Sequence, residues 1–157
     1  MTAFTRMALA LFLSLALGAG QALAIGGGGS KSAKKDHPTY AQAVKRVDAG
    51  DYAGAIPLLQ KAIAADPTNA DAHNYLGFSH RKLGNVDVAL THYGKALELK
   101  PKHRGANEYL GELYLELGQM DKAKERLKVL DDACFFGCDE YRELKEKIKI
   151  YQAKAGS

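Results

Sequence analysis

Two cysteines carry the most distinctive chemistry of this 157-residue chain. Cys134 and Cys138 are separated by Phe-Phe-Gly, and Gly137 permits a sharp turn that brings the two sulfurs together. In an oxidising compartment such a pair forms a disulfide, although so short a loop adds little stability. The alternative is a redox or metal pair, because C-x-x-x-C spacing also occurs in some copper-handling proteins. Both alternatives stay open at this point.

Three histidines form a second group that could do chemistry. His73 and His80 are seven residues apart, so they share one face of a helix, and His92 follows on the next helix. Zinc sites are built from such residues, but no fourth ligand is in view. We therefore interpret the histidines as packing groups and predict no metal and no cofactor.

Three glutamates form a third group. Glu108, Glu112 and Glu116 recur every four residues and therefore form one stripe along a helix. Like charges at this spacing slightly destabilise a helix, so the stripe indicates either a binding surface or a solvated face. The chain has no nucleophile elbow, phosphate loop or histidine-rich metal motif. We therefore predict that the protein is not an enzyme.

The first 24 residues have the pattern of a signal peptide. Arg6 precedes an apolar run, and Ala22-Leu23-Ala24 is a small-x-small cleavage site. Cleavage after Ala24 would release the protein into the periplasm without stable membrane insertion, and an uncleaved N-terminal anchor in the inner membrane is the alternative. Residues 25–35 contain four consecutive glycines, which indicates a flexible Gly/Lys linker. A net charge of +4 is too balanced to predict nucleic-acid binding.

A spacing of 34 residues organises the rest of the chain. It relates three glycines, three alanines and two prolines, which are Gly50, Gly84, Gly118, Ala55, Ala89, Ala123, Pro67 and Pro101. Small residues let two helices pack closely, glycine suits the turn between them, and proline stops the second helix. The spacing therefore predicts helical hairpins that cover each other's apolar faces.

At this spacing the segment from His73 to Pro101 resembles the tetratricopeptide repeat. The matching residues are Leu76, Gly77, Gly84, Ala89, Tyr93, Ala96 and Pro101. The resemblance implies an all-α, right-handed solenoid of three helix-turn-helix repeats, with a capping helix at 139–153. The repeats are expected at residues 36–69, 70–103 and 104–137. Their helices are expected at 38–49, 52–65, 70–83, 86–99, 104–117 and 120–133, and Pro57 should make the start of the second one irregular.

The last helix is expected to close the array. Tyr141, Leu144 and Ile148 continue the apolar register of the repeats, so they should face inward. Charged side chains should face outward, namely those of Glu140, Glu143, Glu146 and Lys147. Three repeats are near the minimum for a stable solenoid, which makes self-association plausible.

In this family the first helix of each repeat lines a concave groove, which implies a binding surface here. The residues at these positions are Tyr40, Val44, Val47, Asp71, Asn74, Phe78, Arg81, Lys82, Glu108, Glu112, Leu115 and Glu116. The Lys, Arg and Asn clamp with which some members hold a peptide C-terminus is absent. Its positions hold Tyr40, Val44, Tyr75, Gly105 and Tyr109.

These features predict a protein–protein interaction or scaffold module of the bacterial cell envelope. Its partner would be a protein or peptide of unknown identity, apolar at one end and basic at the other. The alternative function is a redox- or copper-handling periplasmic protein that uses Cys134 and Cys138.

Overall fold

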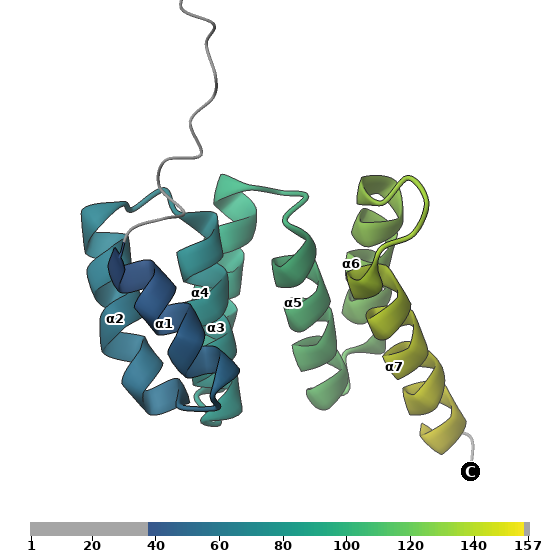
Figure 1. Ribbon diagram of the computed structural model, residues 1–157. Coiled ribbons are helices and arrows are strands. Elements are labelled where there is room, and N and C mark those ends of the chain that lie inside the picture. The colour runs from purple at the N-terminus through teal and green to yellow at the C-terminus, as the bar shows by residue number, and fades with distance from the viewer. Residues whose placement is uncertain (1–37, 156–157) are drawn as a thin grey trace, which may run out of the picture. The chain divides into compact units, whose positions relative to one another are not determined.

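Seven α-helices make up the part of the chain that the computed structural model describes, residues 38–155 (Figure 1). In chain order they are α1 (Pro38–Asp48), α2 (Tyr52–Ala65), α3 (Ala70–Lys82), α4 (Val86–Leu99), α5 (Arg104–Glu116), α6 (Met120–Ala133) and α7 (Asp139–Ala155). They lie in one compact unit, Lys31–Ser157. The predicted all-α fold class is confirmed. The predicted signal peptide (1–24) and linker (25–35) fall outside the described residues.

The helix ends agree with the predicted ones to within two residues. Three starts are fixed by side chains that accept a hydrogen bond from the first turn, as N-cap residues do. Asp51 Oδ1 accepts from the backbone N–H of Gly54, and Asn69 Oδ1 accepts from that of Ala72, both at 2.9 Å. At the start of α5, His103 Nδ1 accepts from the backbone N–H of Ala106. None of the helices in residues 38–155 combines the length and apolar composition that a membrane span needs.

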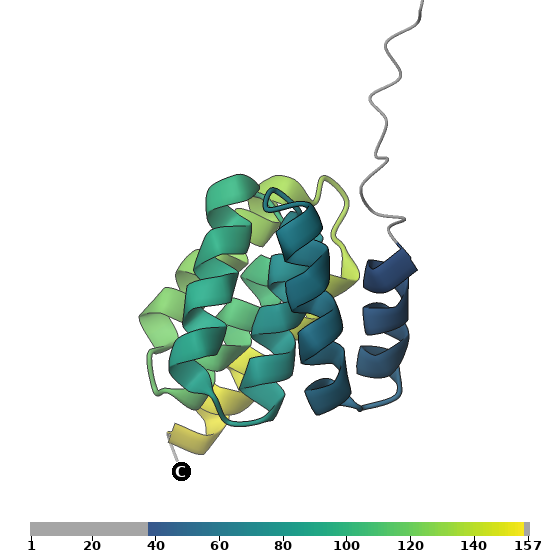
Figure 2. The ribbon, with the colours of Figure 1, turned by 90° about the vertical axis from the view of Figure 1, so that its left-hand side faces the viewer.

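Each hairpin reverses direction at a glycine in a left-handed backbone conformation. The φ angles of Gly50, Gly84 and Gly118 are 75°, 78° and 71°. Residues with a side chain rarely adopt such angles, so these turns explain why glycine recurs at this spacing. Figure 2 looks onto the first such hairpin, in which α1 and α2 run antiparallel.

The irregular turn expected before Pro57 is absent. The helix α2 is continuous from Tyr52 to Ala65, with Pro57 inside it. The proline therefore removes one backbone hydrogen-bond donor from an early turn without ending the helix.

Two further glycines make room for close contacts between helices. A Cβ atom at Gly77 would lie 2.9 Å from Tyr93 Cδ1, and one at Gly111 would lie 2.5 Å from Leu144 Cδ2. Since neither distance is sterically tolerable, α3 approaches the aromatic ring of α4, and α5 approaches α7, only because these positions lack a side chain.

The helix α7 covers the end of the array beside α5 and α6 (Figure 1). Leu144 and Ile148 are buried against Leu115 and Leu130, so the prediction that they face inward is confirmed. Their burial extends the apolar core to the last helix, as a terminal cap requires.

Candidate binding groove

The first helices of the hairpins lie next to one another, because α3 contacts both α1 and α5, and α5 contacts α7. We define the groove as the surface that α3, α5 and α7 share. Two cavities open on it, described below with the residues that line them. The groove residues predicted from the sequence fall into three groups with different surroundings.

The first group, from α1, lies in the hydrophobic core. Tyr40 and Val47 are 6% and 7% exposed and pack with Leu59 and Leu76, while Val44 is half-buried against the same cluster. The prediction that Tyr40 and Val47 line a groove surface is wrong, because α1 uses its apolar face to cover α2 and α3. Of the three groove residues predicted on α1, only Val44 is therefore partly accessible to a partner.

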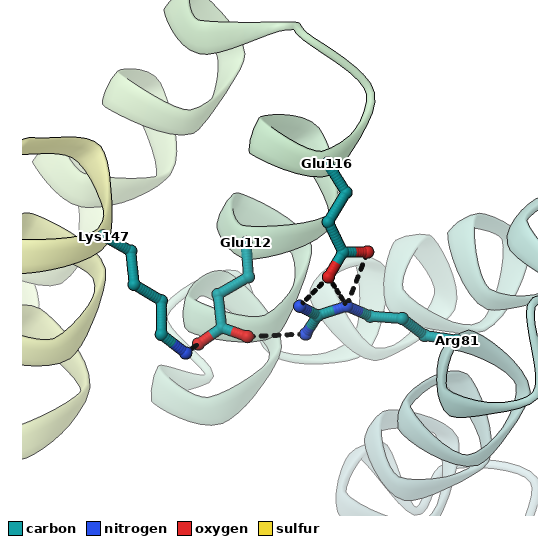
Figure 3. A network of polar contacts seen from close by, with 4 residues as sticks. All are labelled: Arg81, Glu112, Glu116 and Lys147. Carbon is teal, nitrogen blue, oxygen red and sulfur yellow. Dashed lines mark hydrogen bonds and ion pairs between the residues drawn. The ribbon is translucent and has the colours of Figure 1, made fainter. Parts of the chain in front are cut away.

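The second group is a network of charges that joins three helices (Figure 3). From α3, Arg81 donates to Glu112 Oε2 at 2.7 Å and to Glu116 Oε1 at 2.6 Å, both on α5. From α7, Lys147 donates to the other oxygen of Glu112. The side chains of Arg81 and Glu112 are each only 7% exposed, so this ion pair is buried and charge-assisted.

This network refines one expectation and corrects another. Lys147 is exposed, as expected, but its ammonium group reaches back to Glu112. The three glutamates do not form an exposed acidic stripe, since Glu108 and Glu112 are 5% and 6% exposed and Arg81 neutralises Glu112 and Glu116. The cost of like charges along α5 is offset by cations that the neighbouring helices supply.

Glu108 is the one glutamate of α5 without such a cation. Burial raises the pKa of its carboxyl group to about 8, and the hydrogen bond with Glu143 of α7 and the charge of Glu112 add to the effect. Oxygen atoms of these three carboxyl groups lie within 4.8 Å of one another. Glu143 is exposed, as predicted, but its carboxyl group reaches that of Glu108.

The larger cavity has a volume of about 440 Å³ and lies at the Arg81 end of the groove. Its charged lining consists of Arg81, Lys82, Glu112, Glu116, Lys147 and Lys154, and its apolar lining of Leu115, Ile150 and Tyr151. Basic side chains outnumber acidic ones here by four to two. The expectation of an acidic groove end at the third repeat is therefore wrong for this cavity.

The smaller cavity, which we call the Asn74 cavity, has a volume of about 270 Å³. It lies between the first half of α3 and the first half of α5, and Glu140 of α7 adds to its rim. Of the predicted groove residues it contains Asp71, Asn74 and Glu108. Tyr75 and Tyr109 also line this cavity. The sequence indicated only that they stand where other family members have residues of the peptide clamp, and it did not place them in the groove.

Phe78 and Lys82 complete the predicted set. The Phe78 ring packs between Tyr52 and Tyr109, with ring centroids 5.8 Å and 4.7 Å apart, and the Lys82 ammonium lies 5.2 Å from its centroid. Phe78 therefore links the core of the first hairpin to the groove, and Lys82 stays exposed at its rim.

The histidines meet at the contact between α3 and α4. His73 Nδ1 and His92 Nδ1 are 3.2 Å apart, and the His80 ring stacks on His92 at 6.1 Å between centroids. Burial lowers the pKa of all three, and the neighbouring imidazoles help to lower that of His92 to about 4. Neutral rings at neutral pH agree with their interpretation as packing groups.

The corner between α6 and α7 contains both cysteines, in residues 134–138. A disulfide links Cys134 and Cys138 in the structure, with their Cα atoms 5.6 Å apart. The enclosed Phe135 and Phe136 are 95% and 96% exposed, a feature that the spacing alone could not indicate. Formation of the bond in solution stays a prediction, and titration of the native protein with a thiol reagent should find no free thiol.

Comparisons with known proteins address the family. A family model described as a TPR repeat matches residues 45–84, and one described as a tetratricopeptide repeat matches residues 80–148. No curated protein matches the sequence at a significant level.

Several solved structures share the fold. The type III secretion translocator chaperone SycD of Yersinia enterocolitica matches with a TM-score of 0.66 and 18% identity, over 76% of this chain and 93% of that chain. SycD in complex with a peptide of the translocator YopD gives a TM-score of 0.64 and 18% identity, over 75% of this chain and 92% of that chain. MamA gives a TM-score of 0.52 and 26% identity, over 74% of this chain and 59% of that chain. At 18% identity SycD shows the fold alone, and it agrees with the family models: the chain belongs to the tetratricopeptide-repeat proteins.

Proposed function

We propose that this protein is a non-catalytic binding module that holds a segment of a partner protein in the groove of α3, α5 and α7. The observation that carries the proposal is the groove itself, in which polar and charged side chains from three helices line two cavities. Several of these side chains are buried, namely Arg81, Glu112, Asn74 and Glu108. Buried polar groups are costly to maintain, so their concentration on one surface favours a binding role.

The structural comparison supports the type of ligand. The SycD complex contains a peptide of the translocator YopD, so a protein of this fold accommodates a peptide. In this chain, both cavities present charged groups at the groove and apolar or aromatic side chains beside them. We therefore propose a partner segment with charged side chains at intervals, in place of the segment graded from apolar to basic that the sequence suggested.

Site-directed photo-crosslinking in the native host tests the proposal. A photoreactive residue replaces Lys82 or Tyr109, which line the two cavities, and in the control it replaces Thr91, which is exposed on α4 outside both. We expect the same partner band from both groove positions and none from Thr91. Crosslinks of equal yield from all three positions would refute a groove-specific partner. A band at twice the mass of the chain would reveal self-association.

The compartment is part of the same proposal. The pattern of residues 1–24 favours export, and a cell envelope or periplasmic partner follows from it. The intact mass of the protein purified from the native host should correspond to a chain that starts at Ile25. Retention of residues 1–24 would point instead to the N-terminal anchor.

We do not extend the proposal to metal or redox chemistry at Cys134 and Cys138. We predict that their sulfurs are bonded to each other, and the three potential metal ligands that lie close together within residues 38–155 are glutamates. The disulfide is better explained as a device that fixes the corner between α6 and α7, where earlier corners have proline.

A further inference from the structure

Asn74 is a buried side chain without a hydrogen-bond partner for its oxygen. It is 4% exposed, and its Oδ1 atom accepts no hydrogen bond in the structure. A Cβ atom at Gly105 would lie 3.2 Å from Asn74 Nδ2, so the amide group points across the gap from α3 to α5. Because Gly105 has no side chain, the space beside this amide stays open to the Asn74 cavity. A buried acceptor in that position lacks a donor.

Glu108 lies in the same cavity, and its carboxyl group lacks a basic hydrogen-bond donor. It is 5% exposed, and its hydrogen-bond partner is Glu143, another carboxyl group. Within residues 38–155 no ion pair joins Glu108 to a basic side chain, since Arg81 and Lys147 both bind Glu112. A buried carboxyl group held against another carboxyl group is also an acceptor without a cationic donor.

Four of the other acidic and basic side chains of the cavity are already paired, and the fifth, Lys100, is exposed. His103 Nε2 lies 3.1 Å from Asp71 Oδ1, and Arg104 Nε lies 3.6 Å from Glu140 Oε1. The groups left for a ligand are therefore the acceptors Asn74 and Glu108, with the rings of Tyr75 and Tyr109 beside them.

We propose that the Asn74 cavity receives the guanidinium group of an arginine of the partner protein. The inference rests on the proposed function and names the chemistry of one partner side chain. A guanidinium group presents several N–H donors in one plane and so can bind two acceptors at once, here Glu108 and Asn74 Oδ1. Its flat face packs well on aromatic rings, which Tyr75 and Tyr109 provide.

A metal ion fits the same carboxyl groups less well. Glu108, Glu112 and Glu143 are close enough to share one. Yet one oxygen of Glu112 binds Arg81 and the other binds Lys147, so Glu112 has no free oxygen facing an ion. A divalent cation would therefore have only two carboxyl groups as ligands instead of three, and one of the two, that of Glu143, is exposed.

An NMR titration tests the inference without the partner. The probe is N-acetyl-arginine methylamide added to the ¹⁵N-labelled protein, and the matched probe is its citrulline analogue, which has the same shape but no charge. We expect the arginine probe to shift the backbone amide signals of Asn74, Gly105 and Glu108, and the citrulline probe to leave them in place. The Glu108→Gln variant should bind arginine about tenfold more weakly, and the control Glu98→Gln, at an exposed position of α4 outside both cavities, should bind as the wild type does.

Three results would overturn the inference. Citrulline could shift the signals as strongly as arginine, Glu108→Gln could bind arginine with wild-type affinity, or Mg²⁺ could shift the same signals and displace the probe. Glutamine keeps the size and the neutral form that burial favours, so the variant should fold, which its amide spectrum verifies. Because the titration needs no partner, failure of the arginine probe alongside successful groove crosslinking rejects the arginine site alone. The reverse pair of results rejects the proposed function and keeps the site.

Discussion

Two clusters of like residues lie on opposite sides of α3, one towards α4 and one towards α5, and they avoid mutual repulsion in different ways. The histidine cluster (His73, His80 and His92) joins α3 to α4 and remains neutral, because burial lowers the pKa of each ring. The glutamate cluster (Glu108, Glu112, Glu116 and Glu143) joins α5 to α3 and α7. It takes in two cations, Arg81 and Lys147.

The difference follows from the ordinary pKa of each side chain. An imidazole loses its charge near neutral pH at little cost, so histidines can pack together without counterions. A carboxylate at neutral pH keeps its charge and needs a cation in a buried site. Glu108 is the exception that remains without one, and its pKa is raised accordingly. The histidine cluster is therefore complete by itself, whereas the glutamate cluster still has an acceptor to satisfy.

Removing the buried cation Arg81 from the glutamate cluster should have the largest effect on stability. Arg81→Met leaves one oxygen of the buried Glu112 without a donor, so the free energy of unfolding should fall by about 3 kcal/mol. Urea denaturation followed by circular dichroism measures the change. The control is Lys82→Met, which removes an exposed cation from the same helix and should be almost neutral. Adding Glu112→Gln to Arg81→Met should restore part of the loss. Equal effects at positions 81 and 82 would contradict the importance of the buried pair.

Glu108 should make stability fall as pH rises. Its pKa of about 8 in the folded protein lies above the usual value of 4.5, so between these values the folded protein binds more protons than the unfolded one. The stabilisation is fully present below pH 4.5 and is lost as pH rises through 8. Glu108→Gln should flatten this part of the pH profile of thermal unfolding and raise the midpoint at pH 9 relative to wild type. Glu116→Gln, which changes an exposed carboxyl group, should leave the slope unchanged.

The histidine cluster should give the opposite slope at lower pH, with a smaller effect. The pKa of His92 is lowered from 6.5 to about 4, so the unfolded protein binds more protons between these values, and stability falls as pH falls through them. His92→Phe keeps an aromatic ring and should reduce the loss between pH 6.5 and pH 4. The exposed neighbour Thr91 serves as the control through Thr91→Ala. If wild type and His92→Phe lose the same stability in acid, the cluster is not held neutral by burial.

The fold could be predicted from the sequence because its determinants are local and repeat at a fixed spacing. Gly50, Gly84 and Gly118 mark turns that need a positive φ, and Gly77 marks a close helix contact. Each of these requirements acts on one residue type at one position. The turn glycine occurs three times and the close-contact glycine twice, at Gly77 and Gly111, which leaves little freedom in where the hairpins lie.

The groove could not be predicted to the same depth, because its contacts cross between hairpins. Lys147 meets Glu112 across 35 residues, and Arg81 meets Glu116 across the same distance in sequence. Family positions indicate which side of a helix faces the groove, but not whether a side chain there is covered by a neighbouring helix. Tyr40 and Val47 illustrate this limit, since both occupy groove positions and both are buried in the core.

The charge network has a consequence for how the molecule comes apart. In most helical-repeat proteins each hairpin contacts only its neighbours, so the ends can fray while the middle stays folded. Here Glu112 binds Lys147 of the terminal helix with one oxygen and Arg81 of the second hairpin with the other. Detachment of α7 would thus remove a counterion from a buried carboxylate that also fixes the second hairpin. This linkage opposes fraying and favours unfolding of α3 to α7 as one cooperative unit.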